Sequence, residues 1–172
     1  MKKKSKNNII LIGMPSSGKS TIGKELAKRL NADFIDTDSL LRESQKMDLK
    51  DIVINFGHKH FLRVQEEEIL RINVEKCIIA TGGSVIYSKN TMDHLKSLGC
   101  IVYLQIPIEE LKARIKTERR FAKRSDQSFS ELYNERIPLY EKYSDFTVNC
   151  ANKSVDAIVD NIIDILKLKM EK

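Results

Sequence analysis

Short apolar runs alternate with longer amphipathic stretches along the chain. Five of the runs are three to five residues long and rich in β-branched residues, as strands buried on both faces of a sheet tend to be. We expect strands at residues 9–12, 33–35, 77–80, 101–105 and 146–148. Apolar residues recur at helical spacing between these runs, and we expect helices at residues 19–30, 39–46, 49–56, 61–73, 91–98, 109–118, 128–142 and 154–170.

Alternation of short strands with helices is typical of βαβ units and predicts an α/β fold with a largely parallel sheet. The chain of 172 residues holds only 7 Gly and 3 Pro and shows no internal repeat and no flexible linker. We therefore expect one domain over residues 1–172. Turn signals at Gly57, Gly82–Gly83 and Gly99 are expected to mark loops.

Several classes of protein are excluded by composition. No apolar run approaches the roughly 20 residues that cross a bilayer, so we expect no membrane partner. Only four apolar residues follow the basic N-terminus before Gly13, too few for a secretion signal, and we expect a cytoplasmic protein. The widely spaced Cys77, Cys100 and Cys150 lie in apolar stretches, which predicts reduced residues in or near the core rather than a zinc site.

The net charge of +6 raises the hypothesis of nucleic-acid binding. The densest basic stretch is 114–124, yet aromatic residues form only 6% of the chain and do not interleave with these charges as base-stacking residues would. A compact polyanion such as a nucleoside triphosphate suits this stretch at least as well. We expect no nucleic-acid partner.

The clearest chemical motif spans residues 13–20, which read Gly-Met-Pro-Ser-Ser-Gly-Lys-Ser and match the P-loop pattern G-x-x-x-x-G-K-S/T. It follows a predicted strand and opens a predicted helix, the context that the motif requires. Loop N–H groups and the helix N-terminus would hold phosphates, Lys19 would span the β- and γ-phosphates, and the Ser20 hydroxyl would bind Mg²⁺. The expected nucleotide-binding residues are Gly13, Ser16, Ser17, Gly18, Lys19, Ser20 and Thr21.

Two carboxylates, Asp36 and Asp38, follow the second predicted strand, in the crevice where parallel sheets bind ligands. Beside a magnesium nucleotide, one carboxylate can order the metal's water shell while the other takes the proton of an acceptor hydroxyl. Strand alternation would point the two side chains apart, but a turn starting at Asp38 would aim both inward. A simpler role for Asp38, or for Ser39, is the N-cap of the following helix, and the two roles are compatible.

Two further segments hold candidate site residues: the glycine pair after the third strand and an arginine-rich stretch before residue 125. Gly82 and Gly83 would let a small substrate lie against bare backbone, although a tight turn alone explains paired glycines. Arg119, Arg120 and Arg124 fall in a polar stretch between helices, where a lid could close on the phosphates or where a solvated loop could simply lie.

Together these residues resemble the shikimate kinase family of small P-loop kinases. The resemblance rests on the P-loop, Asp36-Thr37-Asp38, Thr81-Gly82-Gly83, an arginine-bearing lid and Glu135-Arg136-Ile137-Pro138-Leu139-Tyr140, the most specific of these motifs. It implies a five-stranded parallel sheet flanked by helices, a substrate-binding helical region at about 36–73 and a lid at about 118–130. It also implies phosphorylation of shikimate by ATP with Mg²⁺, and we expect a monomer.

The resemblance assigns roles residue by residue. Lys19 and Ser20 would hold phosphate and magnesium, and Asp36 would be the metal-side carboxylate. Asp38 would contact the shikimate hydroxyls and act as the base. Arg136 would pair with the substrate carboxylate, a bidentate geometry that lysine cannot supply. Arg120 matches the lid arginine, Arg114 matches a position that packs on adenine, and Gly82 and Gly83 would contact the substrate.

The chain departs from the family pattern in three places. Ser84 replaces the usual third glycine, and Arg120-Phe121-Ala122 replaces the usual R-P-L of the lid. The third departure concerns the family's G-E-x-x-F-R-x-x-E motif, whose arginine is a second ligand of the substrate carboxylate. An ungapped match puts Leu62 at this arginine, whereas a one-residue insertion before Leu62 aligns Arg63 and recovers Glu66. We favour the insertion, which makes Arg63 substrate-binding, and we expect His58 and His60 to be exposed loop residues.

Other functions stay open at this point. Ser84 and the Leu62 or Arg63 alternative are compatible with a related kinase for another small hydroxy acid or sugar. A nucleoside monophosphate kinase has no need of the E-R-x-P-L-Y arginine. The set Lys19, Ser20, Asp36, Asp38 and Arg120 argues against a non-catalytic binding module.

Overall fold

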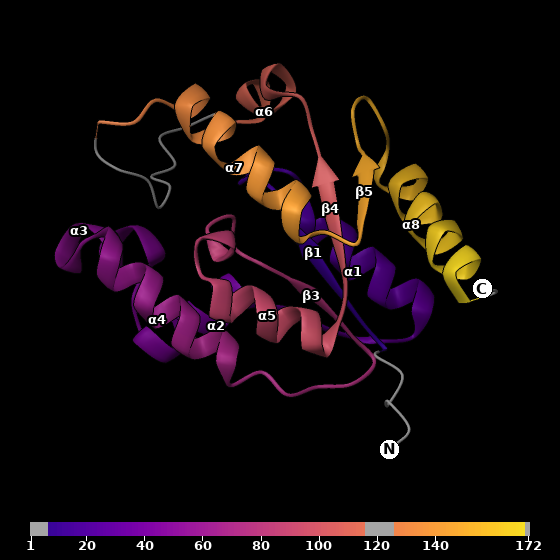
Figure 1. Cartoon of the computed structure of the whole chain (residues 1–172), viewed down its shortest axis with the longest axis horizontal. Helices are drawn as coiled ribbons and strands as arrows, with labels where there is room; N and C mark the ends of the chain where they lie inside the picture. Colours follow the sequence, from indigo (N-terminus) through magenta and orange to yellow (C-terminus); the bar gives the residue numbers. More distant parts are fainter. Residues whose placement is uncertain (1–6, 116–125, 171–172) are drawn as a thin grey trace.

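A five-stranded sheet forms the centre of the molecule in the computed structural model, which describes residues 7–115 and 126–170 (Figure 1). The strand order is β2-β3-β1-β4-β5, and each neighbouring pair is parallel. This confirms the predicted α/β fold. The strands are β1 (Asn8–Ile12), β2 (Asp33–Asp36), β3 (Cys77–Ala80), β4 (Gly99–Gln105) and β5 (Phe146–Asn149).

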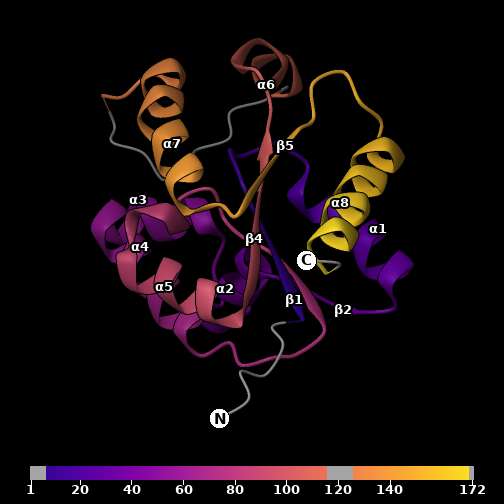
Figure 2. The same ribbon diagram turned by 45° about the vertical axis from the view of Figure 1, so that its right-hand side comes forward.

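Helices cover both faces of this sheet, which gives the three layers of an αβα sandwich. Figure 2 shows α1 and α8 on one side of the sheet, with α4, α5 and α7 on the other. The helices are α1 (Lys19–Leu30), α2 (Thr37–Gln45), α3 (Leu49–Phe56), α4 (His58–Leu70), α5 (Lys89–Leu98), α6 (Ile108–Arg114), α7 (Phe129–Tyr143) and α8 (Val155–Met170), with the short 3₁₀ helix η1 (Val85–Tyr87) after β3.

Two apolar clusters hold the elements together. The main cluster contains all of β1 except Asn8 and the inward faces of the flanking helices, and it includes the buried Cys77 and Cys150. The second, smaller cluster consists of Leu41, Ile52, Phe61 and Val64, which join α2, α3 and α4. Helix α4 therefore packs in both clusters, with Phe61 and Val64 in the second and Ile69 in the main one. Among the described residues, no helix combines the length and apolarity that a membrane crossing requires.

The structure corrects several expected boundaries. Gly99 is the first residue of β4 rather than a loop residue, and a Cβ there would collide with the backbone of Asn8 on the paired strand. The helix predicted at 109–118 is seen as α6, which ends at Arg114. The helix predicted to start at residue 61 begins at His58. Residues 118–125 of the lid expected at about 118–130 lie outside the described residues, and the expected range ends inside α7, which begins at Phe129.

Candidate active site

The P-loop joins the buried strand β1 to helix α1, as predicted. Gly18 has φ +88°, a left-handed conformation that side-chain-bearing residues rarely adopt, and the helix starts directly after it. The Lys19 ammonium donates to the carbonyl oxygens of Gly13 at 2.8 Å and Met14 at 2.7 Å. These bonds hold the positive charge across the loop, where it can meet phosphate oxygens.

The Ser20 hydroxyl and the Asp36 carboxylate lie together beside the P-loop, at the end of β2. Ser20 Oγ donates to Asp36 Oδ2 at 2.5 Å, and Asp36 Oδ1 accepts from the backbone N–H groups of Asp38 at 3.0 Å and Ser39 at 3.2 Å. Asp36 therefore caps α2, so the simpler alternative role of Asp38 or Ser39 as the N-cap is wrong: β2 continues to Asp36 and the helix begins at Thr37.

The donor set of Ser20 and Asp36 fits magnesium. Mg²⁺ prefers hard oxygen ligands and is commonly held by one or two protein groups, with waters and substrate phosphates completing the octahedron. Within residues 7–115 and 126–170, no group of three or more His, Cys, Asp and Glu side chains gathers to form an all-protein metal centre. The two oxygens match a metal that is shared with a nucleotide.

Asp38 lies in the first turn of α2, and its backbone N–H is one of the two that Asp36 caps. Burial raises the pKa of Asp38 above its ordinary value, the negative charge of Asp36 raises it further, and the positive charges of Lys19 and Arg42 oppose the shift. The result is a carboxylate that is more basic than an exposed aspartate. Such a group is well suited to accept a proton in a reaction.

Bare backbone at Gly82 and Gly83 forms a floor between these groups. The Gly82 N–H donates to Thr37 Oγ1 at 3.1 Å, which ties the segment after β3 to the start of α2. A Cβ on Gly82 would lie 2.6 Å from Asp38 Oδ1 and 2.8 Å from Gln65 Nε2. A side chain at this position would therefore displace the carboxylate and the amide from their places beside the backbone.

The neighbouring glycine faces the P-loop and helix α7. A Cβ on Gly83 would lie 2.9 Å from Arg136 Nη1 and 2.9 Å from Pro15 Cδ. The Tyr140 hydroxyl, also on α7, donates to the Gly83 carbonyl at 2.6 Å. The floor is therefore bordered by the Asp38 carboxylate, the P-loop and a guanidinium group.

Arg136 is 1% exposed and is held by Tyr87 from the 3₁₀ helix η1. Its Nε donates to the Tyr87 hydroxyl at 3.1 Å, and its guanidinium carbon lies 5.2 Å from the Tyr87 ring centroid. Tyr87 in turn donates to Glu135 Oε1 at 2.5 Å. Three residues of the E-R-x-P-L-Y motif, Glu135, Arg136 and Tyr140, thus build one network around the floor, and the arginine is pre-oriented for an anion.

Arg114 lies against the P-loop from the side of α6. Its Nη1 donates to the Ser16 carbonyl at 3.4 Å, and its Nη2 pairs with Glu110 at 2.6 Å. Arg120, together with the neighbouring Arg119 and Arg124, falls outside the described residues.

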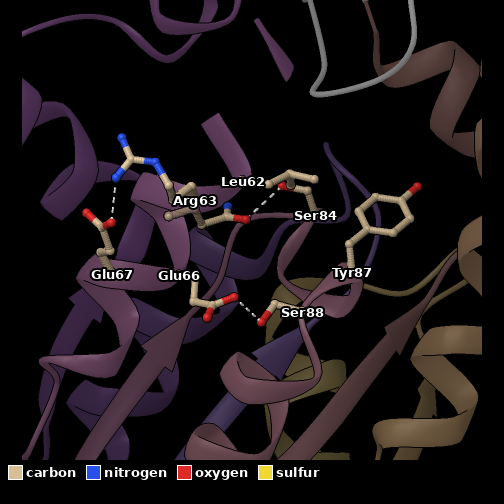
Figure 3. A pocket seen from close by; sticks show the side chains of 8 residues that line it. Leu62, Arg63, Glu66, Glu67, Ser84, Tyr87 and Ser88 are labelled. Atoms are coloured by element: carbon tan, nitrogen blue, oxygen red, sulfur yellow. Dashed lines mark hydrogen bonds and ion pairs between the residues drawn. The ribbon is translucent and has the colours of Figure 1, made fainter. Parts of the chain in front are cut away.

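The rotation of α4 places Arg63 on the exposed side of the helix. Phe61 and Val64 are both 4% exposed and pack in the second apolar cluster, which turns Arg63 outward. The Arg63 side chain is 59% exposed and pairs with Glu67 at 2.6 Å along the same helix. Figure 3 shows Arg63 directed towards Glu67, while Leu62 points to the side of Ser84 and Tyr87. The ungapped register therefore describes this helix better than the inserted one.

A cavity of about 300 Å³ lies between α4 and the segment after β3. Leu62, Gln65, Ser84 and Tyr87 line it, and Arg63 and Glu67 also contribute (Figure 3). Sequence reasoning missed Gln65, Tyr87 and Thr37 as site residues. The available signal for Gln65 was its position four residues after Phe61 and four before Ile69, which places a polar residue on a buried helical face.

Arg63 should contribute little to catalysis. We expect Arg63→Ala to change kcat/KM for the acceptor by less than about threefold, because exposed ion pairs such as Arg63–Glu67 contribute little. Arg136→Ala, the contrasting variant, should lower it by roughly 30- to 800-fold, equivalent to about 2–4 kcal/mol. Steady-state kinetics of both variants provides the measurement. Similar losses in the two variants would restore Arg63 to the site.

A parallel sheet that carries a P-loop at the end of its central strand, with an acceptor floor beside it, defines a P-loop nucleotide-binding kinase fold. The family model for shikimate kinase matches residues 15–167. Shikimate kinase of Clostridium botulinum (strain Okra / Type B1) is 44% identical over 142 residues, which cover 78% of this chain and 83% of that protein. Shikimate kinase of Sulfurihydrogenibium sp. (strain YO3AOP1) is 32% identical over 163 residues, covering 93% of this chain and 98% of that protein. The chain belongs to the shikimate kinase family.

Solved structures agree with this assignment. The crystal structure of shikimate kinase from Aquifex aeolicus superposes with a TM-score of 0.81 at 29% identity, over 93% of this chain and 96% of that one. Shikimate kinase from Acinetobacter baumannii in complex with shikimate has a TM-score of 0.89 at 22% identity, over 99% and 97% of the two chains, which shows the common fold.

Proposed function

We propose that the chain transfers the γ-phosphoryl group of ATP to shikimate, forming shikimate 3-phosphate and ADP. Membership of the family supports this reaction. The observation that carries it is the floor at Gly82 and Gly83, because a proton-accepting carboxylate, a buried guanidinium and the P-loop border the same bare backbone. A small molecule with a hydroxyl at one end and a carboxylate at the other fits this arrangement.

The nucleotide side is formed by the P-loop and its neighbours. We assign phosphate binding to the loop N–H groups and to Lys19, whose charge already lies across the loop. Ser20 and Asp36 would hold Mg²⁺, which when bound neutralises charge on the transferred phosphoryl group. Arg114 is the candidate adenine contact. Arg120 and the lid at about 118–130 stay proposals from the family pattern.

The acceptor side lies between the 36–73 helical region and α7. Asp38 would accept the proton of the reacting hydroxyl, since its raised pKa makes it a better base than an ordinary carboxylate. Arg136 would pair with the acceptor carboxylate as a bidentate fork. We leave Arg63 out of this site because its guanidinium pairs with Glu67.

A second candidate function is phosphorylation of another small hydroxy acid. The observation that favours it is Leu62, which faces the cavity at the position where the family pattern has its second carboxylate-binding arginine. A single arginine would hold a carboxylate less tightly than two. The natural acceptor could then carry an apolar group near Leu62.

A coupled ADP-release assay with a panel of hydroxy acids, sugars and nucleoside monophosphates tests both functions. We expect shikimate to give the highest kcat/KM, and preference for another acceptor would refute the proposal. Leu62→Arg adds a guanidinium on the face that looks into the cavity. If it improves phosphorylation of shikimate at the expense of the acceptor that the unmodified chain prefers, the second candidate is favoured.

A further inference from the structure

Gln65 has an unpaired donor at the edge of the acceptor floor. The residue is 4% exposed, and its Oε1 accepts a hydrogen bond from Ser84 Oγ at 3.0 Å. Its Nε2 is shielded from solvent and has no hydrogen-bond partner within the part of the chain that the structure describes. Buried polar groups are nearly always paired, so an orphan amide beside a binding site points to a ligand.

The orphan amide faces the catalytic carboxylate without bonding to it. A Cβ on Gly82 would lie 2.8 Å from Gln65 Nε2 and 2.6 Å from Asp38 Oδ1, so these atoms are no farther apart than the sum of the two distances. The carboxylate can only accept and the amide nitrogen can only donate. If the Gln65 amide were flipped, its oxygen would face the Asp38 carboxylate, and two acceptors would repel each other. The hydrogen bond from Ser84 to Oε1 and the negative charge of Asp38 therefore favour the same orientation of the amide, with Nε2 towards Asp38.

A hydroxyl is the group that satisfies both atoms together. It can donate to Asp38 Oδ1 and accept from Gln65 Nε2, whereas a second anion would be repelled by Asp38 and a cation would gain nothing from the amide donor. The other oxygen of Asp38 then stays available for the hydroxyl that reacts. Two adjacent hydroxyls on the acceptor match this pair of oxygens.

We propose that Gln65 determines acceptor specificity by donating from Nε2 to the hydroxyl adjacent to the one that is phosphorylated. This role rests on the proposed function, in which Asp38 receives the reacting hydroxyl. The site selects a vicinal diol, because an acceptor without the neighbouring hydroxyl leaves Nε2 buried and unpaired. Sites that hydrogen-bond a substrate hydroxyl discriminate against analogues that lack it for this reason.

Two substitutions and one substrate analogue test this role. Shikimate reacts at its 3-hydroxyl, and 4-deoxyshikimate lacks the neighbouring hydroxyl. Gln65→Met removes the donor at similar volume, and we expect kcat/KM for shikimate to fall about tenfold while that for 4-deoxyshikimate changes less than about twofold. In Gln65→Glu one carboxylate oxygen can still accept from Ser84, but the other oxygen replaces the amide donor. The preference for shikimate over 4-deoxyshikimate should therefore be lost in this variant as well.

Matched controls keep the result specific. Gln45→Met changes a glutamine at the far end of α2 and should leave both acceptors unaffected. Thermal unfolding of each variant checks that the fold is intact. Equal losses for shikimate and 4-deoxyshikimate in both Gln65 variants, or no loss in either, would overturn the role of Gln65.

The unmodified chain separates this proposal from the proposed function. If it phosphorylates shikimate poorly and another acceptor well, the proposed function fails. The Gln65 comparison is then made with that acceptor and its analogue lacking the adjacent hydroxyl. A selective loss for the intact acceptor still supports Gln65, and equal losses still refute it.

Discussion

Lys19→Ala should lower kcat by at least about 10³-fold while the chain still folds. The ammonium is held across the P-loop by the Gly13 and Met14 carbonyls and also donates to Ser17 Oγ at 3.2 Å. In phosphoryl transfer most of the catalysis comes from fixed charges around the transferred group. Removing the positive charge nearest the loop therefore costs transition-state stabilisation that other described groups are not positioned to replace. Single-turnover and steady-state measurements of ADP release give the loss.

Lys28→Ala is the control for this variant. Lys28 lies on the exposed side of the same helix, nine residues from Lys19, and its loss should leave kcat within about twofold because surface charges contribute little. Thermal unfolding of Lys19→Ala separates catalysis from folding. A Lys19→Ala variant with normal turnover would remove the P-loop lysine from the mechanism.

The nucleotide side could be predicted from the sequence because its chemistry is local. The helix after the P-loop was expected at 19–30, and α1 spans Lys19–Leu30. The loop needs a buried strand before it, a helix after it and Gly18 in a left-handed conformation, and all three requirements fall within a short stretch of chain.

The acceptor side could not be predicted as well because distant residues fix it. The rotation of α4 depends on packing of Phe61 and Val64 against Leu41 and Ile52 from two other helices. A helix turns about 100° per residue, so this packing decides between Leu62 and Arg63 as the inward residue. The sequence pattern leaves that choice open, and the exposed Arg63–Glu67 pair favours the ungapped register over the inserted one that we predict.

The junction of β2 and α2 could also be predicted only in part from the sequence. The pattern predicts a strand at 33–35, one residue short of the end of β2, and it does not reveal that the Asp36 side chain caps α2 while it also bonds Ser20. One carboxylate thus both caps the helix and bonds the P-loop serine, while the Asp38 side chain takes no part in the cap. A residue with two roles of this kind is visible only when both partners are placed in space.

Asp38→Asn should lower kcat by about 10²- to 10⁴-fold, the range typical of losing a general base. Asparagine keeps the size of the side chain but cannot take a proton, so the loss should be in kcat rather than in nucleotide affinity. Asp51→Asn on α3 is the matched control and should have little effect. If only the apparent affinity for ATP changes, Asp38 is a structural or metal-side residue instead.

The raised pKa of Asp38 gives this variant two pH signatures of opposite sign. The base acts when it is ionised, so kcat/KM of the unmodified chain should fall as pH drops through a pKa above the ordinary aspartate value, and Asp38→Asn should lack this limb.

The pH dependence of stability has the opposite sign. A group whose pKa is higher in the folded than in the unfolded state stabilises the fold at low pH, and that contribution is lost as pH rises through the folded-state pKa. At neutral pH the charged, partly buried Asp38 therefore destabilises the fold. Asp38→Asn should then have a higher Tm than the unmodified chain at pH 7, with the difference shrinking towards pH 4, and calorimetry across this range measures it. A lower Tm at pH 7 would mean that Lys19 and Arg42 outweigh burial and the Asp36 charge, and the basicity assigned to Asp38 would be wrong.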